Sequence, residues 1–277
     1  MLRKKIFIIL FFVNCFVLVY AQDQRLWATY YGGPNVDYNN SIVTDASGNV
    51  YMAGTTSSAS GIASGGFQNS AAGTADAFLV KFDSLGNRLW ATYYGGTGED
   101  FGRSVATDTF GNVFLAGYTP SVTGIASGGF QNTIGGGYDA FLVKFDASGN
   151  RLWGTYYGGA AAENANCVVT DVSGSVYLAG STSTAVNIAS GGFQNTCGGN
   201  SDAFLVKFDG NGNRLWATYY GGALNDFGYS LATDSLKNIY LAGNTKSTSG
   251  IASGGFQNNY SGFNDAFLVK FDASGNR

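Results

Sequence analysis

The chain repeats itself every 63 residues. The same spacing separates four tryptophans and four copies of Asp-Ala-Phe-Leu-Val-Lys-Phe-Asp, at Trp27, Trp90, Trp153 and Trp216 and from Asp76, Asp139, Asp202 and Asp265. The repeats cover residues 26–88, 89–151, 152–214 and 215–277 without insertion or deletion. A fixed period of this kind is typical of propellers and solenoids, because each repeat buries its hydrophobic surface against its neighbours.

Each repeat contains four segments with strand character. In the second repeat they are residues 89–94, rich in aromatic residues, a short segment at 104–107, and residues 112–116 and 140–145. The last of these alternates, with two Phe and a Val on one face and Leu and Lys on the other. The 42 Gly and only 2 Pro suit many short strands joined by glycine turns. No segment has a convincing helical period.

Two kinds of connection join these strands. Tight turns such as Asp146-Ala-Ser-Gly-Asn150 combine an Asp that bonds the turn backbone with a Gly suited to positive φ, whereas residues 119–138 form a long connection. In an antiparallel order the tight turns share one face and the long connections share the other. We therefore predict an all-β fold, a β-propeller of four blades with four antiparallel strands each. A β-helix is the alternative, although its coils are normally shorter.

The repeated motifs resemble a family of exported bacterial proteins. The segments that carry the resemblance are Asp139-Ala-Phe-Leu-Val-Lys-Phe-Asp146, Leu152-Trp-Gly-Thr-Tyr-Tyr-Gly-Gly159, Val168-Val-Thr-Asp171 and Val176-Tyr-Leu-Ala-Gly180. They are similar to the SBBP-type β-propeller repeat, and the similarity extends over residues 26–277. The resemblance implies a propeller fold but no single activity. The family name implies seven blades, more than four repeats supply.

The two ends of the repeat array are complementary. Residues 26–31 correspond to the fourth strand of a blade, whereas the last repeat stops after its third strand and the next turn, at Arg277. We expect the first strand to complete the last blade and close the ring, since two sheet edges would otherwise stay unpaired. A truncated piece of a longer protein is the alternative.

Residues 1–21 have the features of a secretory signal peptide. Arg3, Lys4 and Lys5 precede an apolar run over residues 6–20, and cleavage is expected after Ala21. The run is short for a membrane-spanning helix. Cleavage removes three of the 15 basic residues, leaving 12 against 18 acidic ones, or a net charge of −6. The sequence thus predicts a secreted or cell-surface protein without a membrane span after cleavage, and disfavours nucleic acid as a partner.

The long-connection face is the predicted binding face, because recognition usually occurs on loops that a rigid scaffold carries. The repeats differ most there, in the segments between the fourth strand of one blade and the first strand of the next. The candidate binding residues are Asp37, Tyr38, Glu99, Asp100, Arg103, Tyr138, Glu163, Asn164, Asp226, Tyr229 and Tyr260. Solvated loops without a specific ligand are the alternative.

An invariant Ile-Ala-Ser-Gly-Gly-Phe-Gln-Asn segment lies inside each long connection. Its aromatic residue is Phe67, Phe130, Phe193 or Phe256. These rings are either platforms for a sugar or plugs that each fill their own blade. We favour the plug, because burying a Phe contributes about 1.5–3 kcal/mol.

The chain lacks the residues that most catalytic mechanisms need. There is no His, and the only two Glu are Glu99 and Glu163, which excludes Ser-His-Asp and Cys-His catalysis and most zinc sites. Glu99 and Asp100 are the best remaining carboxylate pair for a glycosidase. The turn Asp209-Gly-Asn-Gly-Asn213 begins like a calcium loop but has Tyr220 where an EF-hand places Glu. We predict no catalytic residue, no metal and no cofactor.

Two further repeat positions carry predictions. Cys167 and Cys197 each stand where the other repeats have no Cys, so folding should not depend on a disulfide between them. The recurrent Lys of each third strand, such as Lys144, is expected to pair with an Asp of a neighbouring blade.

The sequence thus predicts an exported, non-catalytic propeller that binds a glycan or protein ligand at the cell surface, for example in adhesion. A purely structural segment of a longer surface protein is the main alternative, and a carbohydrate-active enzyme is a weaker one.

Overall fold

The computed structural model describes residues 26–277, so the predicted signal peptide lies outside the described part. Residues 31–277 form one compact unit, and residues 26–30 belong to a separate N-terminal unit. The described residues form β-strands, turns and connections, with no helix among them. Across this described part, nothing has the length and hydrophobicity of a helix that crosses a bilayer.

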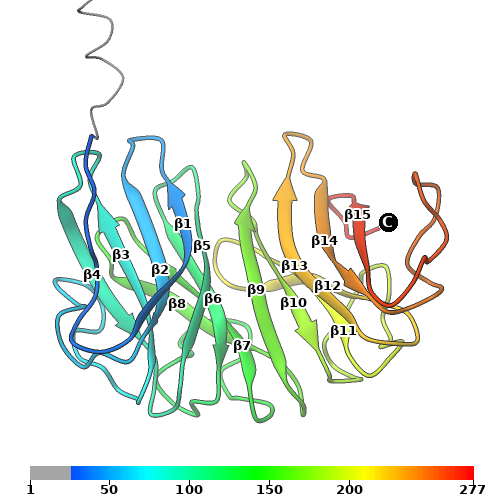
Figure 1. Cartoon of the computed structure of the whole chain (residues 1–277), viewed down its shortest axis with the longest axis horizontal. Coiled ribbons are helices and arrows are strands. Elements are labelled where there is room, and N and C mark those ends of the chain that lie inside the picture. Colours follow the sequence, from blue (N-terminus) through cyan, green and yellow to red (C-terminus); the bar gives the residue numbers. More distant parts are fainter. Residues whose placement is uncertain (1–25) are drawn as a thin grey trace, which may run out of the picture. The chain divides into compact units, whose positions relative to one another are not determined.

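Within residues 26–277, fifteen strands form four antiparallel sheets in chain order (Figure 1). The first sheet holds β1 (Asp37–Thr44), β2 (Val50–Thr56), β3 (Asp76–Phe82) and β4 (Arg88–Tyr94). The second holds β5 (Phe101–Thr107), β6 (Val113–Thr119), β7 (Asp139–Phe145) and β8 (Arg151–Tyr157). The third holds β9 (Glu163–Thr170), β10 (Val176–Thr182), β11 (Asp202–Phe208) and β12 (Arg214–Tyr220). The fourth holds β13 (Asp226–Thr233), β14 (Ile239–Thr245) and β15 (Asp265–Phe271).

The connections separate as the sequence predicts. Each tight turn joins the first strand to the second or the third to the fourth, and these turns gather along one end of the sheets (Figure 1). The long connections and the links between sheets gather along the other end, which we call the loop face. The structure therefore confirms an all-β, propeller-like repeat fold.

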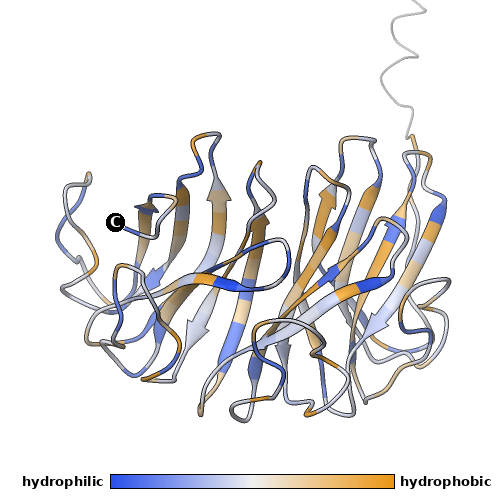
Figure 2. Ribbon diagram, turned by 180° about the vertical axis from the view of Figure 1, so that it is seen from behind, coloured by the Kyte–Doolittle hydropathy of each residue, from blue (hydrophilic) through white to orange (hydrophobic). Residues whose placement is uncertain are grey.

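The core lies between consecutive sheets. The third strands of the first three sheets are buried on both faces, as β7 shows, whereas alternate residues of β15 are exposed; Figure 2 shows how hydrophobic residues line the strands. Phe141, Val143 and Phe145 pack toward the first sheet, and Leu142 packs toward the third. Strand contacts extend from each sheet to the next, mainly through the first strands β1, β5, β9 and β13.

The recurrent Lys does not pair with an Asp, contrary to the sequence-based prediction. Lys144 Nζ donates to the carbonyl of Gly210, in a tight turn of the next sheet, at 2.9 Å. The indole Nε1 of Trp153 donates to the same oxygen at 3.1 Å. The ammonium also lies 5.4 Å from the ring centre of Phe114 in its own sheet, so the Lys144 side chain packs within its sheet while its charged end bonds to the next one.

The fourth sheet departs from the predicted pattern, because it has three strands among the described residues. Residues 26–31 form no strand, so the predicted ring closure by this segment is not present. The reason lies in Tyr31, whose ring packs against Phe78 and Phe82 of the first sheet, with centres 5.5 and 5.8 Å apart. Tyr31 is thereby held at the first sheet, whereas β15 is the last strand of the fourth.

Candidate functional site

A β-bulge occurs at the same place in the first strand of every sheet, near the loop face. The register shifts at these points leave one extra residue each, namely Asn40, Arg103, Asn166 and Tyr229. The first strands therefore begin earlier than the short segment predicted from the sequence, at Phe101 instead of Ser104 in β5. Bulges bend a strand and redirect a side chain, and they are common beside functional sites.

The bulge residues of the first and third sheets tie neighbouring sheets together. Asn40 Nδ2 donates to the carbonyl of Gly102 at 2.7 Å, and Asn166 Nδ2 donates to that of Gly228 at 2.8 Å. In each pair the accepting glycine directly precedes the next bulge residue, Arg103 or Tyr229. These bonds hold the first bulge in register with the second and the third with the fourth, and Val168 N, which donates to Ser104 Oγ at 3.1 Å, joins the second sheet to the third beside the bulges.

In the second sheet the bulge residue belongs to an aromatic cluster. Arg103 Nη2 donates to the Tyr118 hydroxyl at 2.7 Å, and the guanidinium carbon lies 5.1 Å from the Tyr118 ring centre. Phe101 stacks on the same ring with centres 4.8 Å apart, and Tyr138 meets it edge-on at 6.0 Å. Arg103 Nε is buried and has no hydrogen-bond partner among the described residues. We call Phe101, Arg103, Tyr118 and Tyr138 the arginine–aromatic patch.

The equivalent places in the other sheets carry different side chains. Tyr229 is exposed and stacks on Phe227 with centres 6.4 Å apart, and Tyr38 is exposed on β1. Asn164 is half-buried opposite Ser181 in the third sheet. Tyr38 and Asn164 therefore share one repeat position of the first strands, and Arg103 and Tyr229 share the bulge position two residues further along.

Three of the candidate carboxylates are instead buried supports of the loop face. Asp100 accepts hydrogen bonds from the Thr119 hydroxyl, from Ser121 Oγ at 3.0 Å and from Gly96 N at 2.7 Å. Asp226 has the equivalent partners in the fourth sheet, and Glu163 accepts from Thr182 and Gly159 in the third. Asp37 is the half-buried equivalent in the first sheet. We assign these carboxylates to the architecture of the connections between sheets.

A second carboxylate lies close to each of these supports. Burial raises the pKa of Asp76 to about 6, and the neighbouring Asp100 charge adds to that shift. Burial, with a contribution from Glu163, likewise raises the pKa of Asp139 to about 6. Both side chains accept hydrogen bonds from backbone N–H groups of their own long connection, such as Ala72 N and Gly135 N. Each pair therefore places two buried carboxyl groups close together.

The remaining two candidates lie apart from the line of bulges. Glu99 is exposed in the link between the first and second sheets, so it and the buried Asp100 do not form an open glycosidase pair. Tyr260 lines a cavity of about 930 Å³ beside β15 in the fourth sheet. Among residues 26–277 no three His, Cys, Asp or Glu side chains gather as a metal site would require.

The invariant phenylalanines are clamps between sheets. Phe67 packs against Tyr94 of its own sheet and Phe145 of the next, and the Arg151 guanidinium covers its ring at 4.3 Å. Phe130 and Phe193 have equivalent contacts with Arg214 and Arg277. The structural interpretation thus holds for these three rings, although each bridges two sheets instead of filling its own blade, whereas Phe256 is exposed. A covered ring face is a poor platform for a sugar.

Sequence reasoning missed Phe101 and Tyr118, the aromatic partners of Arg103. Phe101 lay inside a segment predicted to be a loop, and Tyr118 followed a strand predicted to end at Ala116. One signal was available, since the positions equivalent to Tyr118 are Thr55, Ser181 and Asn244. Variation between repeats at an otherwise repeated strand end is the pattern that marks the patch.

Comparison with known proteins agrees with this architecture. The model of the SBBP family, described as a beta-propeller repeat, matches residues 26–61, 89–121 and 215–250. These segments are SBBP β-propeller repeats. The remaining 63-residue unit, 152–214, lies between the last two matched segments and forms an equivalent sheet.

Two curated proteins are similar to parts of this chain. One is the uncharacterized WD repeat-containing protein L264 of Acanthamoeba polyphaga mimivirus, 29% identical over 175 residues, which cover 52% of this chain and 12% of that protein. The other is the regulatory protein FlaEY of Caulobacter vibrioides, 31% identical over 190 residues, 66% of this chain and 20% of that protein. The chain thus matches a fifth or less of either relative. Together with the SBBP repeats, these similarities indicate a repeat protein.

Proposed function

We propose that this SBBP-repeat chain is an exported, non-catalytic binding protein that recognises a protein ligand at the cell surface through its loop face. The observation that carries the proposal is the line of bulge residues. The scaffold beneath it repeats almost unchanged, whereas the bulge positions carry Asn, Arg, Asn and Tyr in turn.

The arginine–aromatic patch is the centre of the proposed site. Tyr and Arg are enriched among residues that dominate binding energy at protein interfaces, because they combine a large contact area with directional donors. Arg103 is half-buried and is held by Tyr118 through Nη2, and its guanidinium carries five N–H donors, so the donors that Tyr118 does not use can bind a ligand oxygen. A preordered side chain of this kind loses little conformational entropy on binding.

A purely structural segment of a longer surface protein remains the second candidate. The buried carboxylates, the Phe–Arg clamps and the Lys–carbonyl bonds all serve cohesion between sheets, and an extended array needs the same contacts. The two candidates differ in whether the bulge residues matter to anything other than the fold.

Binding arrays distinguish these candidates. Labelled protein of residues 22–277 is applied to an array of bacterial surface and extracellular proteins, with a glycan array in parallel. We expect a protein ligand, and Arg103→Ala and Tyr229→Ala should each weaken its binding by about tenfold or more, equivalent to 1.4 kcal/mol. Phe110→Ala removes an exposed aromatic residue from a tight turn at the opposite end and is the matched control.

Three outcomes contradict the proposal. Absence of any ligand on either array favours the structural segment. Binding that is seen only on the glycan array would show that the ligand is a carbohydrate and not a protein. Equal losses for Phe110→Ala and Arg103→Ala would place recognition away from the loop face.

A further inference from the structure

The arginine–aromatic patch lies on an internal sheet of the fold. The second sheet packs against the first on one side and against the third on the other. Phe101 and Arg103 come from β5 and Tyr118 from β6, whereas Tyr138 directly precedes β7. The Tyr138 carbonyl accepts a hydrogen bond of 2.9 Å from Glu163 N, at the start of the third sheet. Two sheets therefore fix the position of the patch at the loop face.

A repeated set of hydrogen bonds joins each first strand to the next one. The Ser or Cys after each of the first three bulges accepts a backbone N–H from the following first strand, at 3.1 to 3.3 Å. The Thr that ends each later first strand donates to the carbonyl of the equivalent Thr in the preceding sheet. At two of the three junctions the bulge residue adds a further bond, from Asn40 to Gly102 and from Asn166 to Gly228.

Arg103 is the bulge residue that omits this bond between sheets, although the third sheet follows it. The residue equivalent to Gly102 and Gly228 in the third sheet is Ala165, and Arg103 does not donate to it. Arg103 Nη2 donates instead to the Tyr118 hydroxyl of its own sheet, which is the only hydrogen bond of this side chain within the described residues. Cohesion between sheets therefore does not account for an arginine at this place.

The patch occurs in the second sheet and in none of the other three. The positions equivalent to Tyr118 carry Thr, Ser and Asn, and those equivalent to Tyr138 carry Ala, Ser and Asn. The bulge position itself carries Asn, Asn and Tyr in the other sheets. Arginine and two tyrosines thus appear together at three positions whose other occupants are mostly small or amide side chains, on a backbone that is otherwise repeated.

The polar groups of the patch are mainly hydrogen-bond donors. A guanidinium carries five N–H donors and no acceptor, and one donor of Arg103 is used by Tyr118. The Tyr118 hydroxyl accepts that bond, and its own proton is donated to none of the described residues. The hydroxyl of the exposed Tyr138 likewise has no partner within residues 26–277. A positive charge surrounded by free donors complements an anionic oxygen acceptor.

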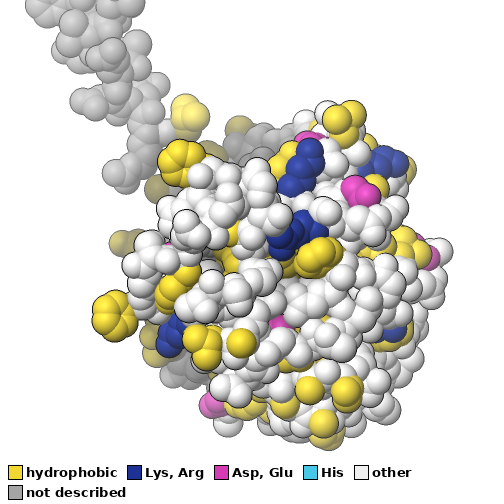
Figure 3. Space-filling model, turned by 90° about the vertical axis from the view of Figure 1, so that its right-hand side faces the viewer, with side chains coloured by type: hydrophobic (Ala, Val, Ile, Leu, Met, Phe, Trp, Pro, Cys, Tyr) yellow, Lys and Arg dark blue, Asp and Glu magenta, His cyan; other side chains and the backbone are white. Residues whose placement is uncertain are grey.

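No carboxylate of the described residues forms an ion pair with Arg103. Asp100 and Glu163 lie in the links on either side, but both are buried and accept hydrogen bonds from threonine hydroxyls and backbone N–H groups. The recurrent cations are used within the scaffold, Lys144 on a turn carbonyl and Arg151 on a phenylalanine clamp. Only 12% of the residues are charged, and Figure 3 shows one side of the molecule with charged side chains scattered among mostly uncharged atoms.

We propose that the arginine–aromatic patch binds a carboxylate of the ligand, from an acidic side chain or from a peptide C-terminus, an inference that rests on the proposed binding of a protein. The planar guanidinium matches the two oxygens of a carboxylate, and the hydroxyls of Tyr118 and Tyr138 supply further donors. Tyr118 holds the guanidinium by a bond of 2.7 Å and by its ring, 5.1 Å away, so the cation is ordered before binding. The rings of Phe101 and Tyr138 limit the access of water, which strengthens a charge-assisted hydrogen bond.

Matched acid and amide peptides test the proposal. Immobilised protein of residues 22–277 selects binders from a library of short peptides. Each selected peptide is then synthesised with its Asp and Glu, and with Asn and Gln in their place, and each version is made with a free and with an amidated C-terminus. Fluorescence anisotropy should give a Kd about tenfold lower for the form that keeps the recognised carboxylate. The version that loses affinity shows whether a side chain or the C-terminus supplies this group.

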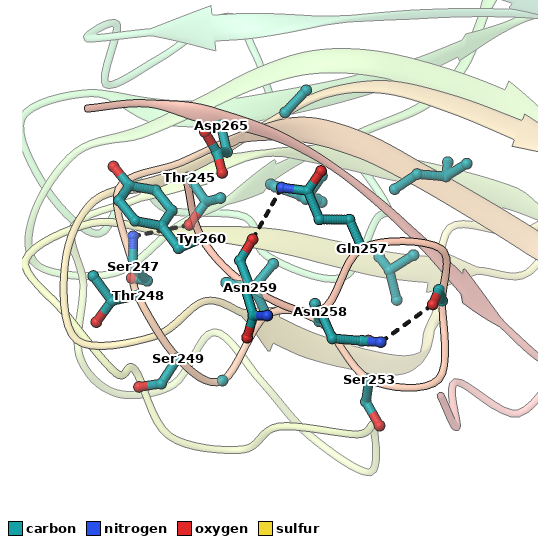
Figure 4. Close-up of a pocket in the computed structure, with 18 of the residues that line it drawn as sticks. Thr245, Ser247, Thr248, Ser249, Ser253, Gln257, Asn258, Asn259, Tyr260 and Asp265 are labelled. Atoms are coloured by element: carbon teal, nitrogen blue, oxygen red, sulfur yellow. Dashed lines mark hydrogen bonds between the residues drawn. The ribbon is translucent and has the colours of Figure 1, made fainter. Parts of the chain in front are cut away.

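Variants of the protein assign the preference to the patch. Arg103→Gln should bind the acid and amide forms equally, and Arg103→Lys should keep only part of the preference, because an ammonium lacks the planar fork. Tyr118→Phe should weaken binding of the acid form several-fold. Lys246→Gln is the matched control, since this exposed lysine lies between Thr245 and Ser247 in the long connection of the fourth sheet (Figure 4) and should leave the preference intact. Circular dichroism with urea unfolding checks that each variant remains folded.

The remaining outcomes separate this inference from the proposed function. Recovery of no peptide, equal binding of acid and amide forms, or equal losses for Arg103→Gln and Lys246→Gln would overturn the inference. Binding of uronic-acid glycans through Arg103, without binding of acidic peptides, would overturn it in favour of an acidic glycan. Acidic peptides bound through Arg103 while no protein on the array binds would support the carboxylate site and contradict the proposed function. A protein ligand whose affinity is unchanged after its carboxylates are amidated would support the proposed function and overturn the carboxylate site.

Discussion

Substitution of glycine by alanine should lower the free energy of unfolding by different amounts in two turns of identical sequence, because a tryptophan packs on only one of them. Asp45-Ala-Ser-Gly-Asn49 and Asp146-Ala-Ser-Gly-Asn150 have the same sequence, and their glycines have φ values of 77° and 85°. A Cβ on Gly149 would lie 2.8 Å from the ring of Trp90, which comes from the preceding sheet. A Cβ on Gly48 would lie 3.5 Å from Ser84 Cβ, an ordinary contact.

The expected costs follow from these two geometries. Positive φ disfavours any residue with a Cβ by about 1–2 kcal/mol, and the smaller conformational freedom of unfolded Ala offsets about 0.4–1 kcal/mol. Gly48→Ala should therefore cost about 1 kcal/mol. Gly149→Ala adds overpacking against a buried indole whose Nε1 is bonded to Ala147 O at 3.0 Å, a further cost of about 1–3 kcal/mol.

Urea unfolding followed by circular dichroism measures the difference between the variants. Gly111→Ala is a second control, since Gly111 lies in the same sheet as Gly149 with φ of 82° and only Ala147 Cβ, at 3.9 Å, within reach. In a Trp90→Leu background, the extra cost of Gly149→Ala should shrink toward that of the controls. Equal destabilisation by all three substitutions, within about 0.5 kcal/mol, would refute the idea that the indole packs tightly on the turn.

Two further predictions concern titration and the thiols. Burial raises the pKa of Asp76 and Asp139 from an ordinary 3.8 to about 6, so the folded state binds more protons than the unfolded state in this window. The thermal unfolding midpoint should thus fall as pH rises from about 4 to 6, and the Asp76→Asn, Asp139→Asn variant should show a flatter profile; a wild-type midpoint that rises through this window would contradict the prediction. Cys167 and Cys197 are free thiols, and Cys167 Sγ accepts from Leu231 N at 3.3 Å where Ser104 Oγ accepts from Val168 N at 3.1 Å. The double Cys→Ser variant should therefore unfold within about 1 kcal/mol of the parent, with or without reductant, and a loss of several kcal/mol would instead indicate a stabilising disulfide.

Local sequence determined the strands, the turns and the order in which they pair. The alternation in segments such as 140–145 and the Asp-x-x-Gly-Asn turns depend on a few neighbouring residues, so they can be recognised in the sequence without the structure. The period of 63 residues shows in the same way that each such set of strands and turns recurs. The antiparallel order of the strands then places every long connection at the same end of the sheets. The predicted binding face, and the positions of Tyr38, Arg103 and Tyr229 on it, follow from this topology.

Contacts between sheets were decided only by the tertiary structure, because they join residues about 60 positions apart that no local pattern links. The partner of Lys144 is a turn carbonyl, and Asp100 and Glu163, predicted for a binding site, are buried supports. The bulge that redirects Arg103 onto Tyr118 depends on how one strand opposes another. Tyr31 packs on the first sheet, whereas β15 is the edge strand of the fourth sheet. The position of such a segment depends on the sheet that its side chains pack against as well as on the strand with which it could pair.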